Sequence, residues 1–227
     1  MKNYIYLFAF IITTSAIAQN ISTVELEKQK LKQALSYSDQ TIATSAMYNI
    51  ISLEGPQSTY KDSLAYMYFN SRNYISCFLV ADDILKYNPN NLEILEMKAV
   101  SLETMGALEK SLESYNLLLS KSNDNYHAYK IAGILLALKK FDEALELAKK
   151  ADTMSDNGEV TVSFQINKNY NQNVQLKPAI AYLEGLIYLG KEMNKEARIS
   201  LERAIQLFPD FVLAKSKLST LDPAEKE

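Results

Sequence analysis

The side chains that could carry catalytic or metal chemistry are few in this chain of 227 residues. It contains one histidine, His127, and one cysteine, Cys77, so a zinc site has almost no material. The adjacent carboxylates Asp82 and Asp83 would point about 100° apart on a helix, whereas a catalytic acid and base must face one substrate. The glycines are scattered and form no phosphate-binding loop. We therefore expect no catalytic residue, no metal site, no cofactor and no small-molecule substrate.

The overall composition is that of an ordinary folding chain without a basic surface. Hydrophobic residues make up 48% and charged residues 22% of the sequence. The 24 Lys and Arg against 27 Asp and Glu give a net charge of −3, and no basic block occurs. Because phosphate contacts are made mainly by clustered Lys and Arg, we expect no nucleic-acid partner. The lone His127 is expected at the surface, and Cys77 is expected to be a small packing residue in a helix.

The first residues have the pattern of a secretory signal peptide. A single Lys precedes nine uninterrupted apolar residues from Tyr4 to Ile12, and an A-x-A step follows at Ala16 to Ala18. The apolar run is about half of the roughly 20 residues that a membrane-spanning helix needs. We therefore expect a signal peptide at 1–18, export to the periplasm or beyond the cell, and no membrane span in the mature chain.

Proline punctuates the remaining chain at regular intervals. Pro56 and Pro89 are 33 residues apart, and each follows an apolar helical segment, as does Pro209. A proline just beyond a helix stops it without removing an internal hydrogen bond. These residues therefore predict the ends of successive repeats.

Small residues recur with the same period. Five small residues follow one another at intervals of 33, 34, 33 and 53 positions. In four of the five cases, a second small residue stands twelve positions earlier. Two antiparallel helices can cross closely only where neither presents a bulky side chain, so each pair predicts a helix hairpin. The first series is Thr44, Cys77, Ser111, Ala144 and Ala197, and the second is Ala65, Ala99, Ala132 and Gly185.

With these features the chain resembles tetratricopeptide repeats, whose period is about 34 residues. The best local matches are LAYMYFNSRNYISCFLVADDILKYNPN and YLEGLIYLGKEMNKEARISLERAIQLFPD. The chain departs from the family pattern where Lys98 and Glu184 replace the usual Leu. The resemblance implies an all-α fold, a right-handed α-solenoid of helix hairpins whose stacking buries the apolar faces. The repeats are expected at 22–57, 58–91, 92–124, 125–158 and 178–210, with a capping helix at 211–221, opened by Asp210, and a polar tail at 222–227.

The segment 159–177 interrupts the last interval and loses the helical period. Val160, Val162, Phe164 and Ile166 alternate with polar residues, and an Asn-rich stretch follows. This alternation predicts an inserted β-hairpin with its turn within 167–172. Two interpretations stand: a structural flap that packs on the neighbouring helices, or a docking edge for a partner strand.

The resemblance also implies a site, because the first helix of each tetratricopeptide hairpin lines a groove that receives a peptide or protein. Carried over to this chain, the groove is aromatic with an acidic stretch, and Tyr is a favoured residue of recognition surfaces. The alternative is that several of these tyrosines only close contacts between repeats. The implied partner-binding residues are Tyr66, Phe69, Glu93, Glu96, Glu103, Tyr126, Tyr129, Tyr182 and Leu186.

The expected function is therefore that of a non-enzymatic scaffold that binds a protein or peptide partner in the cell envelope. The second hypothesis is a structural subunit of an envelope or secretion assembly that docks through the inserted hairpin. An enzyme is the least favoured hypothesis, because no convergent set of catalytic groups is visible.

Overall fold

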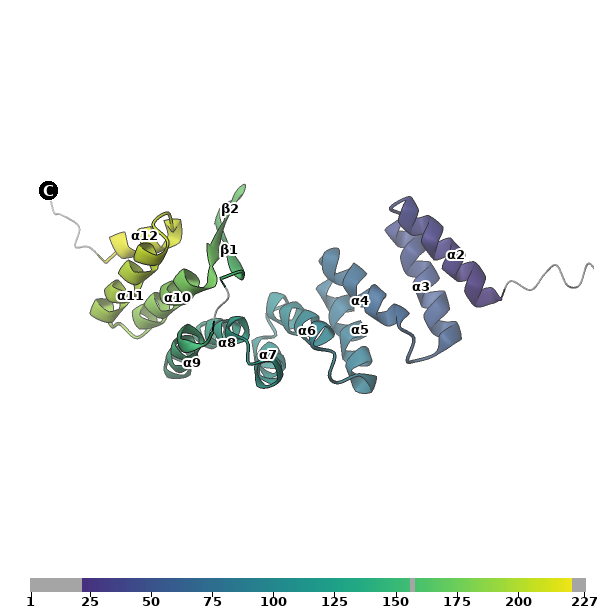
Figure 1. Ribbon diagram of the computed structural model, residues 1–227, viewed down its shortest axis with the longest axis horizontal. Helices are drawn as coiled ribbons and strands as arrows, with labels where there is room; N and C mark the ends of the chain where they lie inside the picture. Colours follow the sequence, from purple (N-terminus) through teal and green to yellow (C-terminus); the bar gives the residue numbers. More distant parts are fainter. Residues whose placement is uncertain (1–21, 156–157, 222–227) are drawn as a thin grey trace, which may run out of the picture. The chain divides into compact units, whose positions relative to one another are not determined.

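The computed structural model describes residues 22–155 and 158–221, and these residues form helices paired into antiparallel hairpins with one small sheet (Figure 1). The expected signal peptide at 1–18 and the tail at 222–227 lie outside the described residues. Backbone contacts divide the chain into an N-terminal part, Met1–Pro89, and a C-terminal part, Asn90–Glu227.

The N-terminal part consists of two helix hairpins. The first pairs α2 (Thr23–Ser36) with α3 (Gln40–Glu54), and the second pairs α4 (Tyr60–Asn70) with α5 (Tyr74–Tyr87). Leu31, Ala46, Met47, Ile50 and Leu64 form its core, so the second hairpin buries its apolar face against the first.

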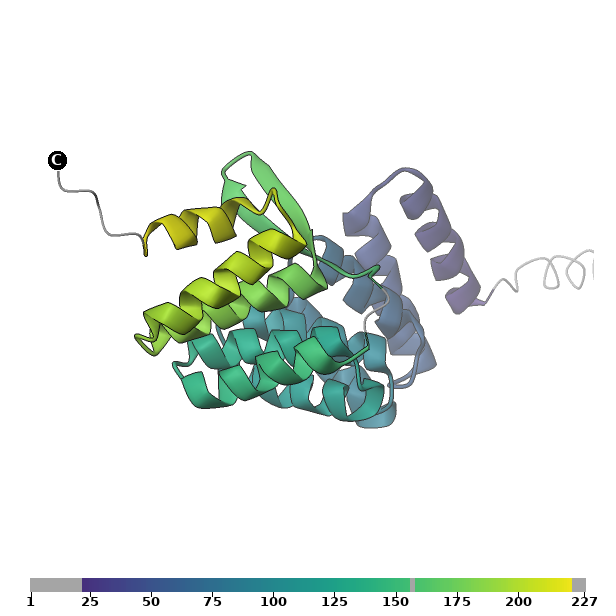
Figure 2. The same cartoon turned by 60° about the vertical axis from the view of Figure 1, so that its left-hand side comes forward.

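The C-terminal part consists of three hairpins, a two-stranded sheet and a final helix (Figure 2). The hairpins are α6 (Leu92–Thr104) with α7 (Leu108–Ser122), α8 (Asn125–Ala137) with α9 (Phe141–Thr153), and α10 (Leu176–Gly190) with α11 (Asn194–Leu207). The strands β1 (Thr161–Asn167) and β2 (Tyr170–Gln175) connect α9 to α10, and α12 (Val212–Ser219) follows α11. Among the described residues, no helix has the length and apolar character needed to cross a membrane.

The turn inside every helix hairpin is built in the same way. One residue of each turn adopts a left-handed backbone, and the amide after it bonds to a carbonyl five residues back, as Asn73 N does to Tyr68 O at 2.9 Å. The five left-handed residues are Ser38, Arg72, Gly106, Lys139 and Glu192. The first four follow one another at intervals of 33 or 34 residues, and the inserted hairpin lengthens the last interval, so the repeat is visible in the backbone itself.

The small residues lie where paired helices cross, as the period predicts. Cys77, Ser111, Ala144 and Ala197 are fully buried, and each follows the cap of its second helix by four residues. A β-carbon added to Gly185 would lie 2.8 Å from the Leu201 side chain, so this crossing requires glycine.

The prediction is wrong by one residue in the first hairpin. The position equivalent to Cys77 is Ala43, which is fully buried and four residues after its helix cap Asp39, whereas Thr44 is half-buried. The degenerate sequence of this repeat allowed either register, because both residues are small.

Several helix ends follow local capping rules, and one predicted cap is absent. The hydroxyl of Ser22 accepts a hydrogen bond from Glu25 N at 3.2 Å and caps α2, and Pro56, Pro89 and Pro209 each follow a second helix. Asp210 does not cap α12, contrary to the prediction, because its N-cap residue is Phe211.

The inserted hairpin forms as predicted, with a shorter turn. Strands β1 and β2 are antiparallel, with Val162 opposite Val174, and the turn is reduced to residues 168–169. Helix α10 starts at Leu176, inside the segment expected to be hairpin. Alternate side chains of β1 are half-buried, while Gln172 and Val174 of β2 are buried. The hairpin therefore packs one face on the helices and leaves the other exposed.

Candidate functional site

The expected partner-binding residues lie on the first helices of four hairpins, and we call the surface formed by those of α6, α8 and α10 the first-helix face. Tyr66 and Phe69 lie on α4 in the N-terminal part, and the remaining seven lie on α6, α8 and α10 in the C-terminal part. Their surroundings differ strongly from helix to helix.

On α4, both aromatic residues are half-buried. Phe69 packs edge-on against Tyr74 of α5, with ring centroids 6.1 Å apart. Its neighbour Tyr68 shares a hydrogen bond of 2.9 Å with Tyr48 of α3, and burial together with this bond raises the pKa of Tyr68 to about 12. Aromatic side chains therefore link α4 to the adjacent helices and leave part of Tyr66 accessible.

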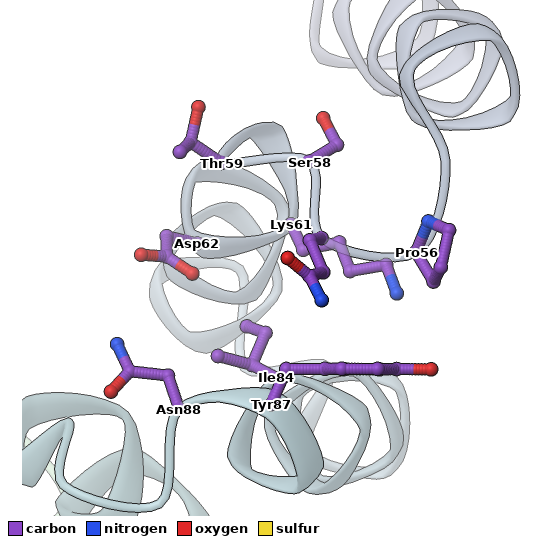
Figure 3. Close-up of a pocket in the computed structure, with 9 residues that line it drawn as sticks. Pro56, Ser58, Thr59, Lys61, Asp62, Ile84, Tyr87 and Asn88 are labelled. Atoms are coloured by element: carbon purple, nitrogen blue, oxygen red, sulfur yellow. The ribbon is translucent and has the colours of Figure 1, made fainter.

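A polar cavity of about 190 Å³ lies in the N-terminal part, between the α3–α4 connection and the end of α5 (Figure 3). The buried amine of Lys61 forms an ion pair with Asp83 and lies 5.8 Å from the centre of the Tyr87 ring. The hydrogen bond from Lys61 is the main cause that lowers the pKa of Asp83, while burial raises the pKa of Asp62 at the cavity wall. Because its amine is held by Asp83, Lys61 is a packing and charge-pairing residue and not a nucleophile.

In the C-terminal part, Glu103 is held in place by a cation and a phenol. Its Oε1 lies 2.7 Å from Lys130 Nζ of α8, and its Oε2 accepts a hydrogen bond of 3.2 Å from the buried Tyr115 of α7. The Lys130 amine also lies 5.7 Å from the centre of the Tyr115 ring. Lys130 therefore neutralises Glu103, which leaves Glu93 and Glu96 as the other carboxylates of α6.

The tyrosines of α8 form a stacked pair beside these carboxylates. The ring centroids of Tyr126 and Tyr129 are 6.4 Å apart, and both side chains are half-buried. Burial, and then the carboxylates of Glu96 and Glu103, raise the pKa of Tyr126 to about 12. The structure thus brings four of the predicted residues together, two stacked tyrosines beside the carboxylates of Glu96 and Glu103.

Helix α10 offers a different surface, because the inserted hairpin covers it. Tyr182 is only 7% exposed and contacts Phe164 of β1 at 5.7 Å and Phe211 at 5.0 Å between ring centroids. Leu186 packs at the edge of the same cluster. The structure places these two residues in an internal core, and their expected role in partner binding stays a prediction.

The hairpin is fixed to the last helix by one side chain that sequence reasoning missed. Gln172 Nε2 donates to Asp210 O at 2.6 Å, and Gln172 Oε1 accepts from Val212 N at 3.0 Å. The second bond satisfies an amide in the first turn of α12, where no side chain of the local sequence does so. No signal in the Asn-rich stretch distinguishes Gln172 from its neighbours, because the partner residues lie about 40 positions away.

Two further residues of this region were missed by the sequence analysis. His127 was expected at the surface, and Lys130 was not singled out. His127 is 7% exposed, lies between the rings of Tyr115 and Tyr126, and bonds to the Ser122 hydroxyl at 2.8 Å. The imidazole of His127 therefore packs between two tyrosine rings and makes one hydrogen bond. Lys130 has no sequence signal, because its partner Glu103 is 27 residues away.

Buried charge is concentrated at the crossing of α10 with α11. Glu184 is 7% exposed and accepts a hydrogen bond of 3.1 Å from Arg203, which also bonds to Asp152 of α9 at 2.9 Å. Burial raises the pKa of Glu184, and the Arg203 charge opposes this. The departure from Leu at position 184 is thus a paired buried carboxylate. Within residues 22–155 and 158–221, no cluster of three metal-ligating side chains occurs.

The repeated hairpins, buried small residues and shared turn geometry define the class: the chain has the tetratricopeptide-repeat fold. No protein-family model matches the sequence. Among solved structures, YrrB, described as a tetratricopeptide-repeat protein with an unusual peptide-binding site, aligns over 91% of this chain and 97% of its own, with 18% identity and a TM-score of 0.68. MamA from Desulfovibrio magneticus RS-1 aligns over 74% of this chain and 84% of its own, with 15% identity and a TM-score of 0.60.

One curated sequence is also similar. The human protein O-mannosyl-transferase TMTC1 is 26% identical over an alignment of 183 residues, and this alignment covers 72% of this chain. The match spans 21% of the length of that protein.

Proposed function

We propose that this protein is a non-enzymatic interaction scaffold that binds a protein or peptide partner on its first-helix face. The observation that carries the proposal is the stacked pair of Tyr126 and Tyr129, half-buried beside Glu96 and Glu103. Stacked tyrosines offer a rigid, amphipathic contact area at a low entropic cost, which suits protein recognition. The likeness to YrrB, described as having a peptide-binding site, supports the same kind of partner.

We also propose that the protein acts in the cell envelope, after export. The support is the sequence pattern of residues 1–18 alone, with its short apolar run and A-x-A step. Cell fractionation and determination of the N-terminus of the mature protein test this part separately. A cytoplasmic protein that keeps residues 1–18 would contradict it.

The first-helix face can be tested by site-specific photocrosslinking in cells that produce the protein. A photoreactive amino acid at Glu93, which is exposed on α6, should attach to the same partner as one at the half-buried Tyr126 on α8. The matched control is Glu113, which is exposed on the second helix α7. Crosslinks from Glu113 alone, or equal crosslinks from all three positions, would refute binding at the first-helix face.

A second candidate function is that of a structural subunit that docks through the inserted hairpin. The observation that favours it is the exposed polar face of β1 and β2, which no helix covers in the described part of the chain. Shortening the turn at residues 168–169 should impair assembly under this hypothesis while leaving crosslinks from Glu93 intact.

A further inference from the structure

The two strands of the hairpin leave different backbone groups unpaired. Leu176 N donates to Val160 O at 3.1 Å, and the register places Val162 opposite Val174 and Phe164 opposite Gln172. In an antiparallel pair, every second residue exchanges both of its backbone hydrogen bonds with the residue opposite. The N–H and C=O groups of the residues between them point away from the partner strand. The outward N–H and C=O groups of β1 therefore belong to Thr161, Ser163 and Gln165.

The inward-facing side chains of the two strands meet different parts of the helical surface. Gln172 of β2 bonds to Asp210 O and Val212 N, which places the α11–α12 connection against β2. Figure 2 shows α12 and this connection next to the hairpin. Beside β1 lie the tyrosines of α8, because Val160 and Val162 pack in one cluster with Tyr126 and Tyr129. A strand added beside β1, on the side away from β2, would therefore lie toward the tyrosines of α8.

The dimensions of a sheet decide what such a strand would contact. A third strand pairs at about 4.8 Å from β1, and its alternate side chains face the same side as Val162 and Phe164. Those side chains would extend the apolar contact over Tyr126 and Tyr129. Beyond the tyrosines lies α6, with the exposed Glu93 and the half-buried Glu96.

The charge around this place favours a basic occupant. Helix α6 carries three carboxylates, Glu93, Glu96 and Glu103, against the single cation Lys98, and Glu103 is paired with Lys130 of α8. Burial, and then the charge of Glu96, raise the pKa of Tyr126, which is consistent with Glu96 lying near the stacked rings. A Lys or Arg on the incoming strand would meet these carboxylates, whereas an acidic strand would be repelled.

We propose that β1 accepts an extended, basic segment of another protein as a third strand, which lies over Tyr126 and Tyr129 with its cations near Glu93 and Glu96. This inference rests on the proposed function, since it names the partner chemistry and binding mode of the same first-helix face. Backbone hydrogen bonds to Thr161, Ser163 and Gln165 provide affinity, and the tyrosines and carboxylates select apolar and basic side chains. The edge of β1 is uncharged and carries no Pro or Lys from Thr161 to Asn167 that would block pairing, and its regular register runs from Thr161 to Gln165.

The test uses a labelled peptide of alternating lysine and valine, about as long as β1, with binding to the full chain followed by fluorescence anisotropy. Ser163→Pro removes the outward N–H of one edge residue and should weaken binding about tenfold, whereas the matched control Ser163→Ala keeps that N–H and should bind as the wild type does. Glu96→Gln should weaken binding by about threefold and reduce its dependence on salt.

A second measurement leaves the protein unchanged. The same peptide with N-methyl groups on alternate residues cannot pair along one edge and should lose binding, and a glutamate–valine peptide should not bind. If the lysine–valine peptide does not bind the wild type, or binds Ser163→Pro and Ser163→Ala alike, strand addition is wrong. If a partner still crosslinks from Glu93 in the Ser163→Pro variant, the proposed function holds and strand addition at β1 does not. A dimer that Ser163→Pro dissociates, seen by sedimentation velocity, would identify a second copy as the occupant and overturn the proposal.

Discussion

Replacing Gln172 by Leu should loosen the last helix while leaving the helix hairpins intact. The side chain of Gln172 is 7% exposed and makes two hydrogen bonds, to Asp210 O and from Val212 N. Each such bond contributes about 0.5–1.5 kcal/mol to stability, and buried partners left unsatisfied add to the loss, so we expect a cost of about 1–3 kcal/mol. The loss falls on α12, whose Phe211 and Ala214 close the aromatic core below the hairpin.

Two companion variants grade the effect. Gln172→Glu keeps an acceptor for Val212 N, at a helix start that favours negative charge, but loses the donor to Asp210 O. It should therefore fall between the wild type and Gln172→Leu. Asn173→Ala changes the adjacent exposed residue and should remain within about 0.5 kcal/mol of the wild type.

Two measurements check this series. Urea unfolding followed by circular dichroism gives the free energy of unfolding, and hydrogen exchange of residues 210–219 reports local opening of α12. The reasoning is refuted if Gln172→Leu matches Asn173→Ala in both measurements. Equal loss of protection in every helix would also contradict it, because the expected opening is confined to the C-terminal end.

Three further predictions concern the turns, the hairpin core and pH. Gly106→Ala should lower the free energy of unfolding by about 1 kcal/mol through backbone strain alone, since the added β-carbon meets nothing within 4 Å, and thermal melts would show it. Phe164→Ala should cost about 2–4 kcal/mol and expose Tyr182, which tyrosine fluorescence and urea unfolding would detect. Burial raises the pKa of Glu184 above 4.5, so its contribution to stability is greatest at low pH and is lost as pH rises through the raised pKa. Glu184→Gln should therefore show a shallower fall of unfolding free energy with rising pH, and an equal slope would refute this assignment.

The periodic features of the molecule could be predicted because each is repeated or local. The sequence itself repeats the small residues at helix crossings and the prolines beyond second helices. The alternation of apolar and polar residues that predicts β1 is local to that segment. Where the repeat degenerates, the same reasoning slips, as it did by one residue from Ala43 to Thr44. The sequence period therefore predicts the helices and the small residues at their crossings. The prediction goes wrong where two small residues are adjacent, because the period alone does not choose between them.

The contacts of the candidate site could not be predicted, because they join residues far apart in the sequence. Glu103 meets Lys130 across 27 positions, and Gln172 meets Asp210 across 38. Nothing in the repeat pattern encodes either pair, and the second also depends on where the inserted hairpin lies in space. The same holds for Tyr182, which the pattern placed on an accessible face and the hairpin covers.

The insertion limits where a partner can bind. To reach Tyr182 on α10, a partner would have to displace the hairpin and expose Phe164 and Val174. Burying each of these side chains contributes about 1.5–3 kcal/mol, so displacement would weaken binding by roughly 10² to 10⁴-fold. A partner that lies beside β1, over Tyr126 and Tyr129, avoids this cost and gains the hairpin's own backbone as a binding surface. Because the inserted hairpin covers the first-helix face at α10, it favours binding at α8, where the tyrosines lie beside the carboxylates of α6.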